Sequence, residues 1–211
     1  MIINLFQTRS SFGADYVLSD NANQAIYTAN IRLAVAKRSI SLIKNNQPLL
    51  LAEINIKTYI NDITKGLLRG EYHDINIQNP QGDICGSIRY KRVKVFFGGY
   101  GYYEINYEGE VFTCYFVGRG KEGMFICIYI GEQQVAMIEK PPLVRDNKDY
   151  YKIYTIDNKY NDIISFFCLY YDDIAFSNYT EVVSYKKSIS YINTLDKRIK
   201  SKYNPQFKEL C

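Results

Sequence analysis

The chain has 211 residues, an ordinary hydrophobic fraction of 47% and a mild net charge of +4, so it can bury the core of one large domain or two small ones. Its five cysteines are scattered and never form a C-x-x-C pair, which disfavours a disulfide framework or a cysteine metal site: Cys85, Cys114, Cys127, Cys168 and Cys211. Reduced thiols and the lack of a signal-peptide pattern over residues 1–18 predict a cytoplasmic protein.

The predicted elements are mostly strands. The sequence has 21 tyrosines, 11 phenylalanines and no tryptophan, and aromatic residues with many isoleucines and valines favour sheet. Residues 1–13 form a first strand or a flap, and residues 58–69 form a helical turn or a long loop. Five pairs of β-favouring runs flank turns rich in Asn, Asp, Gly or Pro, which is typical of hairpins. The pairs are 16–18 with 25–28, 39–43 with 49–54, 74–77 with 84–90, 102–106 with 111–117, and 124–129 with 134–139. A last strand is predicted at 150–156.

Residues 161–176 are predicted to form a helix that is apolar on nearly all sides. Only Ser165 and Asp172 form a polar stripe, with Cys168 at its border. Such a helix must be enclosed, and acids at both ends leave it too short to span a bilayer. We interpret Asp172 and Asp173 as the point where it emerges into water. The alternative is a fully buried strand over 163–171.

Eleven or twelve strands and one enclosed helix predict a specific architecture. A closed antiparallel barrel removes its own sheet edges, and one of this size has a lumen too wide for strand side chains alone to fill. The fold class predicted is therefore mainly β: a closed barrel of about twelve strands around a central hydrophobic helix, plus a C-terminal amphipathic helix.

The order of these elements also resembles a known family. The run of hairpins, the strand starting at Asp149-Tyr150-Tyr151 and the helix from Asn161-Asp162 to Asp172-Asp173-Ile174 are similar to the tubby C-terminal-like superfamily, in its LURP-one-related and phospholipid-scramblase-like branch, which includes small bacterial members. The resemblance covers residues 12–178 and implies a twelve-stranded barrel around a central helix. It also implies phosphoinositide binding through basic residues on the barrel surface. The chain departs from the family pattern in the size of its helix side chains, because this helix carries the bulky residues Phe166, Phe167, Tyr170 and Tyr171.

A second helix is predicted at about 181–201, in a C-terminal extension (179–211) to the barrel domain (1–178). Its apolar residues recur at helical spacing: Val182, Tyr185, Ile189, Ile192, Leu195 and Ile199. The extension has seven basic residues and three acids, while the rest of the chain has 19 of each sign. Packing on the barrel exterior is the favoured role of this helix, before a dimer or partner contact and adsorption to a membrane surface. The basic residues predicted for such a face are Lys186, Lys187, Lys197, Arg198 and Lys200.

A second basic cluster lies at Arg89, Lys91, Arg92 and Lys94. On a strand the first two side chains face one way and the last two the other. Protection of an exposed strand against edge pairing explains these charges without a ligand. The functional alternative is contact with an anionic lipid headgroup. Nucleic acid is not expected as a partner, because the barrel region is neutral.

Catalysis is not predicted. The only histidine, His73, lies in a predicted loop, and no local nucleophile motif accompanies it. We therefore expect no enzyme activity, no cofactor, no metal site and no transmembrane segment. The function predicted is binding or scaffolding, with an anionic phospholipid headgroup or a protein as partner, and with homodimerisation through the C-terminal helix as an option. The alternatives are a membrane-associated lipid-handling protein and, if the lumen is open, a lipocalin-type barrel for small molecules.

Overall fold

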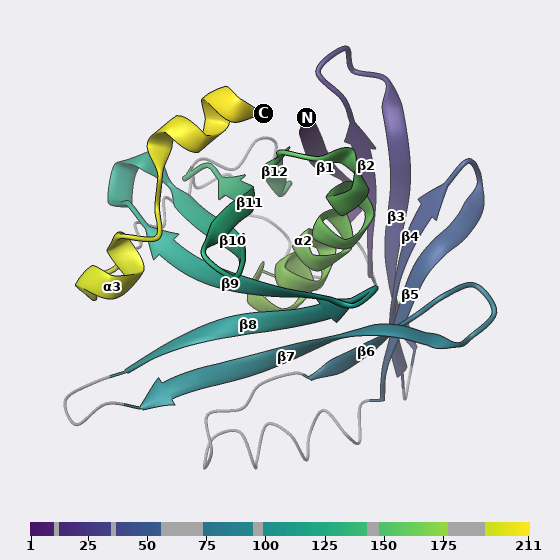
Figure 1. Cartoon of the computed structure of the whole chain (residues 1–211). Coiled ribbons are helices and arrows are strands. Elements are labelled where there is room, and N and C mark those ends of the chain that lie inside the picture. The colour runs from purple at the N-terminus through teal and green to yellow at the C-terminus, as the bar shows by residue number, and fades with distance from the viewer. Residues whose placement is uncertain (11–12, 35–36, 56–73, 95–98, 143–147, 177–192) are drawn as a thin grey trace.

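A computed structural model describes residues 1–10, 13–34, 37–55, 74–94, 99–142, 148–176 and 193–211. Twelve strands form a closed antiparallel barrel (Figure 1), in which each strand pairs with its neighbours in sequence and β1 pairs with β12. The strands are β1 Ile2–Ser10, β2 Gly13–Ser19, β3 Ala25–Ala34, β4 Lys37–Lys44, β5 Gln47–Asn55, β6 Ile75–Gln78, β7 Ile84–Lys94, β8 Gly99–Tyr107, β9 Glu110–Gly118, β10 Met124–Ile130, β11 Gln133–Lys140 and β12 Tyr150–Thr155. The predicted fold class is confirmed.

The start of the chain is a strand and not a flap. Residues 2–6 of β1 pair with residues 150–154 of β12, and this pairing closes the barrel. The predicted strands are present, mostly longer than the hydrophobic runs that indicated them. Tight turns suit the hairpins: Asn45 and Asn46 between β4 and β5 both have positive φ, a conformation that asparagine tolerates well. Residues 58–69 and His73 lie outside the described part of the chain.

The helix α2, Asn161–Phe176, runs through the barrel (Figure 1). Its central residues from Ile163 to Tyr170 have no exposed surface, and they form one core with the inward-facing residues of the strands. Bulky helix residues fit because the strands supply small or slim partners at several inward positions, such as Ala14, Ala29 and Ala52. The prediction of an enclosed helix is therefore confirmed, and the alternative of a strand over 163–171 is wrong.

The acids at the end of α2 do not mark its emergence into water. Asp172 and Asp173 are 1% and 0% exposed. Asp172 accepts hydrogen bonds of 2.5 Å from the hydroxyls of Tyr16 and Tyr151, while Asp173 is paired with Arg38 at 3.0 Å. The sequence interpretation failed because the strands bring partners for both carboxylates to this end of the barrel, so the acids stay buried.

The predicted helix over 181–201 is not continuous. Residues 193–196 are not helical: Asn193 forms a β-bridge with Arg119, and the Thr194 N–H donates to the Gly118 carbonyl at 3.0 Å. The helix α3 covers only Lys197–Lys200, after Asp196 caps the Arg198 N–H. In residues 193–196, hydrogen bonds to the barrel and the Asp196 cap replace the backbone hydrogen bonds of the predicted helix. Residues 181–192 lie outside the described part.

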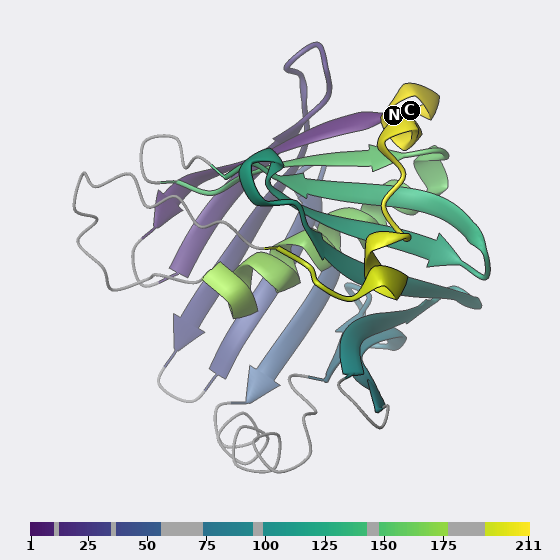
Figure 2. The same cartoon turned by 90° about the vertical axis from the view of Figure 1, so that its left-hand side faces the viewer.

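The C-terminal segment, residues 193–211, packs on the outside of the barrel (Figure 2). Ile199 of α3 and Phe207 of a 3-10 helix, Pro205–Leu210, are buried against outward-facing residues of β9 to β12, among them Phe125 and Met137. The Tyr129 hydroxyl donates to the Lys202 carbonyl at 2.7 Å. Packing on the barrel exterior is thus the role of the described part, although Leu195 of the predicted stripe is 85% exposed.

Candidate binding surfaces on the outside of the barrel

The enclosed helix leaves the outer surface as the place for function. α2 occupies the space that a lipocalin-type barrel keeps for its ligand. Neither α2 nor α3 has both the length and the apolar character to cross a bilayer. Within the described residues, no three His, Cys, Asp or Glu side chains are grouped so that they could hold a metal ion.

Two of the four basic residues on β7, Arg89 and Lys91, have partners on neighbouring segments. The Arg89 guanidinium donates to the Ile75 carbonyl at 2.5 Å and to Asn76 Oδ1 at 2.6 Å, and its Nε lies 3.5 Å from Asp74. Lys91 Nζ lies 3.9 Å from Glu104 Oε1. Arg89 therefore joins β7 to the start of β6, because its guanidinium is hydrogen-bonded to a backbone oxygen and an amide oxygen there.

The other two members of this cluster do not join Arg89 and Lys91. Arg92 is exposed and lies on the same face of β7 as Ile88 and Tyr90, opposite to Arg89 and Lys91. Lys94 ends β7, and its side chain lies outside the described part. The structure therefore does not bring the four predicted cations to one site.

Three partly buried tyrosines lie beside Lys91 on the outer face of the barrel. Tyr100 and Tyr102 come from β8 and Tyr115 from β9, with ring centroids 5.8–6.4 Å apart. Lys91 pairs with Tyr102 across β7 and β8. Alternation along the strand places Tyr103 on the inner face, where it packs against Phe167 of α2, and so leaves Tyr102 outside.

The C-terminal segment contributes two cations to these tyrosines. The Arg198 guanidinium lies 5.1 Å from the ring centre of Tyr100, and Lys202 Nζ lies 5.0 Å from that of Tyr115. Cation–π contacts of this kind stabilise exposed sites by about 0.5–1 kcal/mol. We call Lys91, Tyr100, Tyr102, Tyr115, Arg198 and Lys202 the tyrosine–basic face.

The other predicted cations of the C-terminal segment are exposed. Lys197 and Lys200 extend from α3, while the helix directs Ile199 at the barrel. Arg198 also binds Asp196, and these hydrogen bonds lower the pKa of the Asp196 carboxyl to about 2. Leu195, directly before this cap, is the most exposed of the large hydrophobic residues in the described part of the chain. Lys186 and Lys187 lie outside that part.

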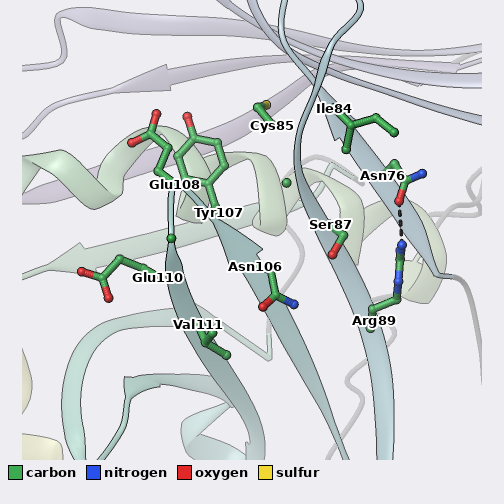
Figure 3. Close-up of a pocket in the computed structure, with 12 residues that line it drawn as sticks. Asn76, Ile84, Cys85, Ser87, Arg89, Asn106, Tyr107, Glu108, Glu110 and Val111 are labelled. Carbon is green, nitrogen blue, oxygen red and sulfur yellow. Dashed lines mark hydrogen bonds between the residues drawn. The ribbon is translucent and has the colours of Figure 1, made fainter.

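A shallow hollow opens on the same wall of the barrel, at the opposite end of β8 (Figure 3). It has a volume of about 380 Å³ and is formed by β6, β7, β8 and the start of β9. Ser87 and Asn106 form its floor, with Ile84 on one side and Val111 on the other. Arg89 was predicted for an anion contact, but in this hollow its guanidinium is bound to Asn76.

A buried carboxyl with a strongly raised pKa, that of Asp172, lies inside the barrel. Burial, and then the charge of Asp149, raises the pKa of Asp172 to about 7, against the opposing effect of Lys140 and of the Tyr151 and Tyr16 hydroxyls. Lys140 Nζ donates to the Tyr151 hydroxyl at 3.0 Å and is paired with Asp149. Asp172 is buried, and its hydrogen bonds with Tyr16 of β2 and Tyr151 of β12 join the helix to the wall of the barrel.

The sequence interpretation missed Tyr102, Tyr115 and Lys202. Tyr100 and Tyr102 alternate on one strand, which was a usable signal for a shared face, but Tyr115 and Lys202 join them only through the pairing of β8 with β9 and the path of the C-terminal segment. The chain matches no protein-family model, no curated protein and no solved structure.

Proposed function

We propose that this chain is a non-catalytic binding protein that attaches to an anionic phospholipid surface through the tyrosine–basic face and the adjoining α3. The observation that carries the proposal is the combination of an 85% exposed leucine, Leu195, with the exposed cations Lys197 and Lys200 and three partly buried tyrosines on the same outer face. Tyrosine is enriched at membrane–water interfaces. Each Lys or Arg near an anionic leaflet contributes about 1 kcal/mol of binding.

The geometry supports a weak and reversible attachment. Leu195 offers roughly 1.5–3 kcal/mol if it enters the acyl region, and a few lysines add a salt-sensitive contribution of similar size. The same surface suits nucleic acid poorly, because base stacking needs free ring faces. Here Arg198 and Lys202 already lie over the rings of Tyr100 and Tyr115.

Flotation with phosphatidylcholine vesicles, with and without phosphatidylserine, tests this function. We expect binding only to the vesicles that contain phosphatidylserine, and release as salt is raised. Lys197→Glu with Lys200→Glu should weaken binding at least about tenfold, since two contributions of about 1 kcal/mol are lost and two repulsive charges are added.

The matched control is Lys148→Glu with Lys159→Glu, which reverses the charge of two exposed lysines elsewhere on the protein. It changes the net charge by the same amount as the test variant does. This control should keep most of the binding. Wild-type protein that stays unbound to phosphatidylserine vesicles, or equal losses in the two double variants, would contradict the proposal.

A protein partner is the second candidate, favoured by the same tyrosines and by Arg198. Tyr and Arg are enriched among the residues that dominate the binding energy of protein interfaces. A homodimer through the C-terminal helix has less support, because Ile199 of α3 is already buried against the barrel, and the described part of the segment keeps no apolar stripe for a second copy.

A further inference from the structure

The hollow between β6 and β9 differs in chemistry from the tyrosine–basic face. Its two sides are aliphatic: Ile84 is 64% exposed and Val111 is 46% exposed, and they are two of the four exposed large hydrophobic residues in the described part of the chain. In Figure 3 they lie on opposite sides of a floor made by Ser87 and Asn106. Exposed aliphatic groups that share one hollow are typical of a surface that receives another molecule.

The floor offers neutral hydrogen-bonding groups. Asn76, Ser87 and Asn106 are register neighbours across β6, β7 and β8, and Asn106 pairs on its other side with Val111 of β9. No hydrogen bond of the Ser87 hydroxyl occurs within the described residues, and the Asn106 amide reaches only Glu104 Oε1, at 3.5 Å. These groups can both donate to and accept from a peptide backbone.

The charge at the hollow is negative at one end. Glu108 lies in the hairpin turn between β8 and β9, and Glu110 is the first residue of β9. Glu108 and Gly109 both have positive φ, the backbone of a tight two-residue turn. The positive group of the hollow, Arg89, is bound to Asn76 and to backbone carbonyls. A phosphate or carboxylate ligand would therefore meet repulsion and no available cation.

We propose that this hollow binds an extended peptide segment of a partner protein that carries aliphatic side chains and a Lys or Arg. The aliphatic side chains contact Ile84 and Val111, the peptide backbone bonds to Ser87 and Asn106, and the basic side chain lies at Glu108 and Glu110. Tyr107 also lines the hollow, so a sugar that stacks on its ring is the competing ligand in the test. This site is separate from the tyrosine–basic face and does not depend on lipid binding.

A titration of the full-length, isotope-labelled protein by nuclear magnetic resonance tests the proposal. The probes are three synthetic peptides, of alternating valine and lysine, alternating serine and lysine, and alternating valine and glutamate. We expect the backbone amide signals of Ser87, Asn106 and Val111 to shift with the valine–lysine peptide. The serine–lysine peptide should bind more weakly, and the valine–glutamate peptide should leave these signals unchanged.

Two variants test whether the basic side chain of the peptide contacts the glutamates of the hollow. Glu110→Lys should weaken binding about three- to tenfold, the change expected when an exposed ion pair becomes a repulsion, while Glu132→Lys, in the hairpin turn between β10 and β11, should bind as the wild type does. Unchanged signals with the valine–lysine peptide would overturn the proposal. So would equal shifts with the valine–glutamate peptide, binding unaffected by Glu110→Lys in a protein whose remaining spectrum is native, or shifts of these signals with maltose and not with peptide.

Discussion

Phe167→Asp is expected to abolish the folded state. Phe167 has no exposed surface and packs against Tyr103 of β8, with ring centroids 5.8 Å apart, and against Tyr170 of its own helix. Loss of the ring costs about 3–5 kcal/mol, and an unpaired carboxylate in the lumen adds several more. Together these approach or exceed the 5–15 kcal/mol that typically stabilises a domain.

Urea denaturation followed by circular dichroism measures this effect. Leu210→Asp is the matched control, because it makes the same kind of change at a side chain that is 70% exposed. It should shift the free energy of unfolding by no more than about 0.5 kcal/mol. A Phe167→Asp protein that unfolds at the same urea concentration as the control would show that α2 is not enclosed.

Asp172→Asn is expected to change how stability depends on pH. The folded-state pKa of Asp172, raised to about 7 by burial, exceeds the ordinary value of 3.8, so the folded protein retains a proton that the unfolded chain releases. The wild type therefore loses stability as pH rises from about 4 to about 7, with a slope of at most about 1.4 kcal/mol per pH unit from this group. Above this window the contribution levels off.

Asparagine cannot titrate, so the variant should gain stability relative to the wild type across this window, by a few kcal/mol in total. The measurement is the free energy of unfolding at several pH values between 4 and 8. Asp172→Ala should share the changed pH profile but be less stable throughout, because the buried hydroxyls of Tyr16 and Tyr151 lose their acceptor, at about 1–3 kcal/mol each. Parallel profiles for the wild type and Asp172→Asn would contradict this assignment.

The barrel and its helix were predictable because their signals are local. Alternation and turn residues indicated the strands, and a helix with only Ser165 and Asp172 on its polar side required an enclosure. The burial of Asp172 and Asp173 was not predictable in this way. It depends on Tyr16, Arg38 and Tyr151, which lie far away in the sequence and reach the helix only after the barrel closes.

The binding surfaces were only partly predictable, for the same reason. The clusters of basic residues in the sequence indicated Lys91 and Arg198 as candidates. Both lie beside the same tyrosines only because β7 pairs with β8 and the C-terminal segment runs past β8. The periodicity after residue 181 predicted one helix up to about residue 201, whereas Thr194 is bonded to β9 and Asp196 caps the start of the short helix α3. Side-chain hydrogen bonds to the backbone compete with helix formation, and an apolar period does not report them.

Hydrogen exchange of the full chain, with and without phosphatidylserine vesicles, tests the central claim that the lumen is filled and that binding occurs outside. We predict that the amides of α2 exchange among the slowest and do not change when vesicles are added, while residues 99–102 and 193–203 gain protection. Exchange of α2 as fast as that of the hairpin turns, or protection on vesicle addition that appears in α2 and not at the tyrosine–basic face, would contradict the account.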